Sequence, residues 1–194
     1  AQKRNDPKQA VCMNFDLSED QEMMRDMFAR FLDENSSMAR VRVADANGGF
    51  DAALWHGLAE QGALSIRVPE AAGGLGMGLF DAAVLMEEAG RTLVSGPLAE
   101  ALVAARIGAT LGGDAWPMDA VLGGEKVVSL ALHDIADRPK QWIAGGDASD
   151  AVVARRGAER RGSSESTFAM RVVQCATERG KCSSSSRNVT TPSP

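Results

Sequence analysis

The chain has 194 residues and a formal net charge of -5, and 44% of its residues are hydrophobic. No apolar run approaches the roughly 20 residues that cross a bilayer, and three cysteines and two histidines have neither metal-ligand spacing nor an even disulfide framework. Eight of 21 basic residues but only three of 26 acidic ones lie from Arg155 onward, so the front is strongly acidic. From these features we expect no membrane span, no metal site and no binding to nucleic acid, and we expect a soluble cytoplasmic protein.

The chain opens with an aperiodic segment and then a helix. Residues 1–12 are expected to be a disordered leader before Met13. Ser18 is followed three residues later by Gln21, which is the spacing of a capping box, and apolar residues then recur every three or four positions. The pattern predicts a helix over about 18–35.

A second helix and a connector follow. Asp51 is a suitable N-cap, and Gly62 suits a left-handed C-terminal stop, so a helix is predicted between them. Residues 63–70 are short and apolar and contain Pro69, which disfavours helical geometry at the residue before it. We predict a buried extended connector there.

Two more helices lead into strands. Separated apolar and polar positions predict a third helix over 79–91. The fourth has Pro97 in its first turn and Gly112 past its end, and it is almost entirely apolar, so it should be central. The β-branched segments 125–132 and 150–154 are predicted strands.

The glycine-rich stretch PEAAGGLGMG, residues 69–78, either cradles a phosphate or turns the chain. A dinucleotide-binding loop of the form G-x-G-x-x-G needs a third glycine, but that position is Leu79 when counted from Gly74 and Asp81 when counted from Gly76. A Walker-type phosphate loop needs a Lys-Ser/Thr pair, and none follows. The spacing therefore favours a loop that needs several residues with positive φ.

Four motifs occur in one order along the chain: F-x-L-[ST]-E-x-Q, W-x-x-L-x-x-x-G, P-E-x-x-G-G-x-G and E-E-x-[GA]-R. Over residues 13–154 the chain resembles the acyl-CoA dehydrogenase family in these motifs. The matching residues are Phe15, Leu17, Ser18, Glu19 and Gln21; Trp55, Leu58 and Gly62; Pro69, Glu70, Gly73, Gly74 and Gly76; and Glu87, Glu88, Gly90 and Arg91.

The resemblance implies a mainly α fold. Residues 13–124 would form the N-terminal helical bundle domain, and 125–154 the truncated start of the middle β domain. Residues 155–194 would be an unrelated, disordered Ser- and Arg-rich tail, which a shifted reading frame or a genuine interaction tail would both explain. The family assembles as oligomers, so a homo- or hetero-oligomer with acyl-CoA dehydrogenase subunits is expected.

The resemblance also implies FAD-dependent oxidation of an acyl-CoA to the trans-2-enoyl-CoA, in lipid or steroid side-chain breakdown. A catalytic Glu in the family's C-terminal domain removes the α proton, and these residues lack that domain. We therefore assign no catalytic residue and expect the chain alone to be inactive. Glu87 and Glu88 point about 100° apart and are expected to be solvated or paired in salt bridges.

By position, the stretch from Gly96 to Ala104 resembles the lining of the family's acyl pocket. The candidate substrate-binding residues are Gly96, Pro97, Glu100, Ala101 and Ala104. Their small side chains would leave room for a bulky acyl group. A helix interface tightly packed through Ala and Gly explains the same residues equally well.

Two further segments resemble the family's flavin contacts. LALHDIA stands where [A]-x-T-E-P is usual, and QWIAGG resembles W-I-[ST], so the candidate FAD-binding residues are Leu132, His133 and Trp142. Trp142 could stack on the flavin or be a structural Trp at a domain edge, and His133 is more often a local hydrogen-bonding group than a cofactor ligand.

Three functions stay open at this point. The chain is the front of a flavin-dependent acyl-CoA dehydrogenase, or a non-catalytic subunit that pairs with a flavin-binding partner. The third is a helical module whose motifs reflect the fold alone.

Overall fold

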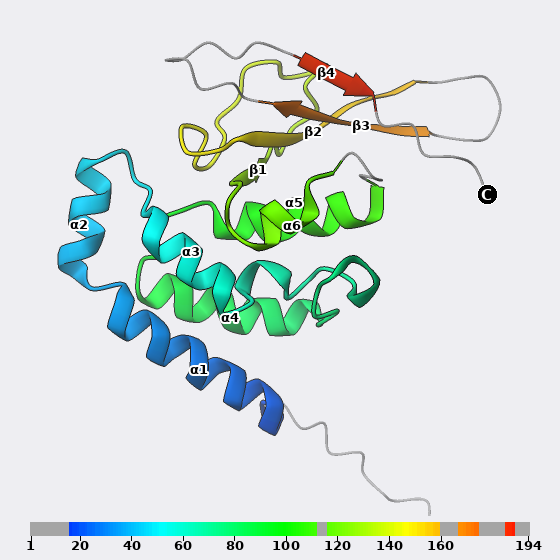
Figure 1. The fold of residues 1–194 in the computed structure, drawn as a ribbon. Helices are drawn as coiled ribbons and strands as arrows, with labels where there is room; N and C mark the ends of the chain where they lie inside the picture. The colour runs from blue at the N-terminus through cyan, green and yellow to red at the C-terminus, as the bar shows by residue number, and fades with distance from the viewer. Residues whose placement is uncertain (1–15, 112–115, 160–166, 175–184, 189–194) are drawn as a thin grey trace, which may run out of the picture.

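The helices stack in layers beneath a sheet in the computed structural model, which describes residues 16–111, 116–159, 167–174 and 185–188. The elements are α1 (Glu19–Asn35), α2 (Met38–Ala46), α3 (Ala52–Glu60), η1 (Ala63–Ser65), η2 (Glu70–Ala72), α4 (Leu79–Arg91), α5 (Leu98–Leu111), α6 (Met118–Leu122), β1 (Val128–Leu130), β2 (Ala151–Glu159), β3 (Thr167–Gln174) and β4 (Ser185–Asn188). In Figure 1, α1 lies farthest from the sheet, and α5 packs against the sheet through β1. The predicted mainly helical fold, a bundle followed by strands, is confirmed. The predicted leader lies outside the described residues.

The first helix begins at the predicted capping box. The Gln21 N–H donates to the Ser18 hydroxyl oxygen at 3.2 Å, and the Ser18 N–H donates to Gln21 Oε1 at 3.0 Å. One face of α1 buries Met24, Phe28 and Leu32, and α1 packs on α4. Each such side chain contributes about 2 kcal/mol on burial, so the apolar stripe fixes the face that turns inward.

The second helix is one that the sequence analysis did not predict. Its residues form no apolar stripe, and within α2 only Ala44 is buried. Ser37 caps its start, and Arg40 is tied to Asp51 by hydrogen bonds of 2.6 Å from Nε and 3.0 Å from Nη2. Asp51 also caps α3 by accepting from the Leu54 N–H at 2.9 Å. A tertiary ion pair rather than local periodicity therefore positions α2.

Replacing Asp51 with Asn is expected to lower the free energy of unfolding at neutral pH by about 1 kcal/mol, because the amide keeps the cap but loses the charge pair with the partly exposed Arg40. The Arg40 hydrogen bonds hold the pKa of Asp51 below its usual value. This stability is present above the unfolded-state pKa of about 4 and is lost as the pH falls through the lower folded-state pKa. Urea unfolding of both proteins at several pH values checks this. A stability difference that does not shrink in acid would contradict it.

The connector over 63–70 is buried as predicted, but the prediction that it is extended is wrong. η1 and η2 are short 3-10 turns. Ala63, Leu64 and Ile66 are all fully buried. An extended strand would point Ala63 and Leu64 to opposite faces, whereas a tight turn brings both into the core.

The glycine-rich stretch 69–78 turns the chain. Five consecutive N–H groups, from Gly73 to Met77, donate to backbone carbonyls of residues 65–70 at 2.8 to 3.1 Å. Gly73 and Gly76 have φ values of +80° and +63°, which favour glycine. A phosphate loop would need those N–H groups free, so the interpretation as a turning loop is confirmed and the phosphate alternative is wrong.

The third and fourth predicted helices form as α4 and α5. Asp81 fixes the start of α4: its Oδ2 accepts from the Gly78 N–H at 2.6 Å, and its Oδ1 accepts from Gln21 Nε2 at 2.7 Å. The central place predicted for α5 is confirmed, because it contacts η1, α6 and β1. The short helix α6 was not predicted, since its five residues are too few to show a helical period.

The sheet extends into the segment predicted to be a disordered tail. Its strand order is β1-β2-β3-β4, with β1 and β2 parallel and the remaining pairs antiparallel. The prediction of disorder for 155–194 is therefore wrong for residues 155–159, 167–174 and 185–188; the rest of that tail lies outside the described residues. Basic and Ser-rich composition hid the β-type run in β3, and strand pairing uses backbone groups that every non-proline residue has.

Candidate functional site

The loop after Trp142 lies against the start of α5. A Cβ added at Gly145, where φ is +60°, would lie 2.7 Å from the Cγ and Cδ atoms of Pro97, so the backbone touches the proline ring directly. Ser129 Oγ donates to the Ala144 carbonyl at 2.8 Å and anchors the loop on β1. The predicted flavin segment and the predicted acyl segment therefore meet, and we call this contact the junction.

The candidate flavin residues gather in one exposed loop region. Leu132 is 73% exposed and Trp142 is 97% exposed. Gln141 joins them: its Oε1 accepts from the His133 N–H at 2.9 Å, and its Nε2 donates to the His133 carbonyl at 3.1 Å. The ring of Trp142 therefore has almost no cover in this structure, and its role as a flavin contact or as a structural Trp at a domain edge stays a prediction. The His133 ring has a local neighbour, because Arg138 Nη1 lies 3.4 Å from its Nε2.

The candidate acyl-lining residues face the interior rather than an open cavity. Ala101 and Ala104 are fully buried, Pro97 is buried, and Glu100 is half-buried in the first turn of α5. A Cβ at Gly96 would approach Trp55 Cε3 to 3.0 Å. These residues form a packed interface in this structure, so binding of an acyl group there would require the packed side chains to move apart.

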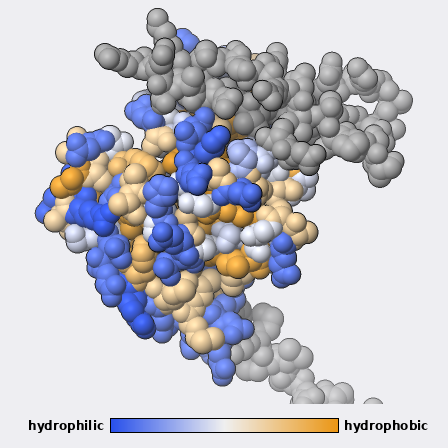
Figure 2. All heavy atoms as spheres, in the orientation of Figure 1, coloured by the Kyte–Doolittle hydropathy of each residue, from blue (hydrophilic) through white to orange (hydrophobic). Residues whose placement is uncertain are grey.

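An apolar groove runs along the opposite side of α5, between α4 and α5. We call it the α4–α5 groove, and its volume is about 670 Å³. Figure 2 shows hydrophobic side chains between hydrophilic ones over the helical part of the surface. The residues lining the groove are Arg67, Leu79, Ala82, Ala83, Met86, Ala99, Leu102, Val103, Arg106, Ile107, Thr110 and Leu111. The apolar residues all round α5 were the signal for it, but the sequence analysis assigned them to burial.

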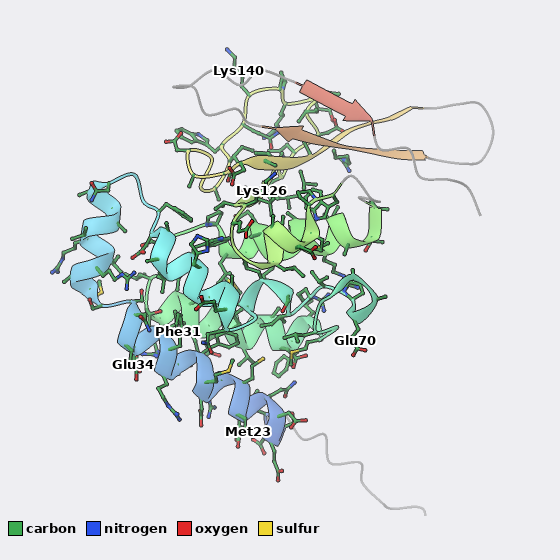
Figure 3. All side chains as sticks on the ribbon, in the orientation of Figure 1. Met23, Phe31, Glu34, Glu70, Lys126 and Lys140 are labelled. Atoms are coloured by element: carbon green, nitrogen blue, oxygen red, sulfur yellow. The ribbon has the colours of Figure 1, made fainter. Side chains whose placement is uncertain are left out.

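A second hollow lies on the face of α1 that carries Phe31, and Gln61, just after α3, also lines it. Its volume is about 500 Å³, and its lining mixes exposed methionines with charged side chains. Figure 3 labels Met23, Phe31 and Glu34 along this face. Its polar rim distinguishes it from the apolar α4–α5 groove.

Two carboxylates, Glu88 and Asp134, are engaged in ion pairs. Glu88 Oε2 lies 2.8 Å from Arg91 Nε, which confirms the expected salt bridge, and Glu87 is exposed. Asp134 is buried, and its Oδ2 lies 3.3 Å from Arg155 Nε. Within the part of the chain that the structure describes, no group of three His, Cys, Asp or Glu side chains is placed to hold a metal. None of the helices described there has the length and apolarity to span a bilayer.

Comparisons with known proteins point in one direction. Residues 18–113 match the family model described as acyl-CoA dehydrogenase, N-terminal domain. Acyl-CoA dehydrogenase IpdE2 of Mycolicibacterium smegmatis is 32% identical over 73% of the chain and 44% of its own length. The Mycobacterium tuberculosis protein of that name is 34% identical over 70% of the chain and 42% of its own length. The chain thus spans less than half the length of these relatives.

Solved structures share the fold. A chain of the ChsE4-ChsE5 complex from Mycobacterium tuberculosis superposes with a TM-score of 0.68 at 21% identity, covering 84% of this chain and 49% of that one. Butyryl-CoA dehydrogenase from Megasphaera elsdenii gives 0.63 at 17% identity, covering 86% and 51%. At these identities the likeness concerns the fold alone.

Proposed function

Because the chain belongs to the acyl-CoA dehydrogenase family, we propose that its junction forms part of a site that desaturates an acyl-CoA thioester between the α and β carbons. The contact of Gly145 with Pro97 carries this proposal. It joins the segment that resembles the flavin contact to the segment that resembles the acyl lining. The substrate would come from lipid or steroid side-chain breakdown in the cytoplasm, as the family resemblance implies.

The residues of the exposed loop suit a flavin. Trp142 and Leu132 present uncovered apolar surface that a planar ring would cover, which removes that surface from water. These two side chains would hold FAD at this edge, beside His133, whose backbone N–H and carbonyl are hydrogen-bonded to Gln141. When bound, FAD would supply the hydride-accepting chemistry that desaturation requires.

The acyl lining would act by position and exclusion of water. Ala101 and Ala104 offer small apolar side chains on the buried face of α5. An acyl group held there would be shielded from solvent, which strengthens the electrostatic interactions at the thioester. Glu100 stands at the rim of this face, half-buried in the first turn.

The proposal assigns no proton-abstracting residue to the described part of the chain. Glu88 is held by Arg91, Asp134 is held by Arg155, and Glu87 is exposed on α4. A polypeptide of these 194 residues is therefore expected to give no acyl-CoA-dependent reduction of a dye. Addition of a subunit that supplies the base would restore it.

Substitution of Trp142 by Phe tests the flavin surface. Trp55 and Trp116 are buried, so the solvent-exposed component of tryptophan emission comes from Trp142. We expect FAD to quench this component in the unchanged protein, because the flavin would stack on the ring. Trp142→Phe should remove the quenching and weaken FAD binding about tenfold, roughly the loss of 1.4 kcal/mol.

The matched control is Leu75→Ala, which changes an exposed apolar residue on the glycine loop and should leave FAD binding unchanged. Equal FAD affinity in Trp142→Phe and the unchanged protein would contradict the flavin surface.

The alternative is a non-catalytic subunit that pairs with a flavin-binding acyl-CoA dehydrogenase subunit. The ion pair of Asp134 with Arg155 favours it, because the carboxylate at the position usual for the family's flavin contact is already engaged. The ChsE4-ChsE5 structure is a complex of two proteins. Co-purification followed by a count of FAD per chain separates the two: an assembly with flavin only on the partner supports this alternative.

A further inference from the structure

The α4–α5 groove lies away from the junction. Residues two apart in an α-helix point about 200° apart. Ala101 and Ala104 face the interior, whereas Val103 and Arg106 line the groove. A ligand in the groove would therefore not share the acyl-lining face, and what binds there is a separate question from the desaturation.

The dimensions of the groove suit a third helix. α4 and α5 have 13 and 14 residues, so each wall is about 20 Å long. Ala82, Ala83 and Ala99 lie along it and would let another helix approach within about 8 to 10 Å. Leu79, 73% exposed, and Val103, 46% exposed, leave apolar surface uncovered at the rim.

The charged residues that the structure describes in the groove lining are all of one sign. They are Arg67 and Arg106, and no carboxylate is among the described lining residues. Arg106 Nη1 donates to the Arg67 carbonyl at 2.9 Å, and Arg67 Nη1 donates to the Met77 carbonyl at 2.9 Å. Neither guanidinium forms an ion pair with a carboxylate among the described residues, so both keep N–H donors for an acidic group.

We propose that the α4–α5 groove docks an amphipathic helix of a partner polypeptide, with its apolar face on the groove and an Asp or Glu against Arg106 and Arg67. The apolar walls supply contact area, and the arginine pair selects the orientation through charge complementarity. A fatty acyl chain would also suit apolar walls but would have no charge preference along its length.

Two labelled peptides of about 14 residues test this. Both carry Leu and Ala on one helical face; one has Glu near its end, and the other has Lys in its place. We expect the Glu peptide to bind the full chain at least fivefold more tightly than the Lys peptide by fluorescence anisotropy. Arg106→Glu should reverse that order, and Val103→Asp should weaken binding of both peptides more than tenfold.

Met23→Asp, in the hollow on α1, is the matched control and should leave both affinities unchanged. Circular dichroism melts establish that each variant is folded. No peptide binding, an order that Arg106→Glu does not change, or displacement of both peptides by palmitate with no charge preference would each overturn the proposal. The assay contains neither FAD nor acyl-CoA, so its failure is distinct from failure of the proposed desaturation.

Discussion

Replacing Gly74 with Ala is expected to lower the free energy of unfolding by about 3 kcal/mol or more. A Cβ at this position would lie 2.1 Å from the Val68 carbonyl oxygen and 2.4 Å from Val68 Cβ. The same carbonyl accepts the Gly76 N–H at 2.8 Å, so it cannot move without breaking the loop. The methyl group would separate the loop from the connector, and urea unfolding followed by circular dichroism measures the loss.

The matched control is Gly90→Ala in α4. No atom lies within 4 Å of a Cβ added at Gly90, and its φ is not positive. Ala there should stabilise the protein by about 0.5 to 1 kcal/mol, because it has the higher helix propensity. If Gly74→Ala were as stable as Gly90→Ala, the close approach of the loop to Val68 would be refuted.

Gly108→Ala is expected to cost about 3 kcal/mol although it too places Ala in a helix. A Cβ at Gly108 would lie 2.0 Å from Trp116 Cε2, within the indole ring. A rigid ring cannot yield as a flexible side chain would, so Trp116 must leave its buried place. In a Trp142→Phe background, its emission should shift toward that of exposed tryptophan, alongside a lower urea midpoint.

A second substitution separates overpacking from a general intolerance at this helix position. Trp116→Leu removes the ring, so Gly108→Ala should cost less than about 1 kcal/mol in that background. An unchanged cost in the double variant would show that the indole is not what Gly108 accommodates.

The helices that the sequence predicted correctly are those with complete local signals. α1 has a capping box and an apolar stripe, and α3 and α5 have suitable terminal residues. α2 lacks such a stripe and depends on the pair between Arg40, which lies in α2, and Asp51, which caps α3. The local sequence pattern does not reveal an ion pair between two separate segments, which is why α2 was not predicted.

For the glycine-rich stretch 69–78, the sequence explains one part of its role and the structure explains another. The spacing of Gly74 and Gly76 already argued against a phosphate site, because a phosphate loop requires glycines at set positions. Only the structure shows that Gly74 is needed for close approach to Val68, while Gly73 and Gly76 are needed for positive φ. A motif gives the residue types and their order, but why each glycine is needed depends on its own backbone conformation and on the backbone that packs against it.

The sequence by itself determined the family, the order of the main helices and the two segments that resemble flavin and acyl contacts. The tertiary structure decided that those segments meet where Gly145 touches Pro97, that Trp142 is uncovered, and that the outer side of α5 lines a groove with Arg106 at its rim. The sequence pattern predicts that α5 is almost entirely apolar, but which of its sides is buried depends on the elements that pack against it. Those partners come from distant parts of the chain, so only the folded arrangement distinguishes the buried face from the face left open.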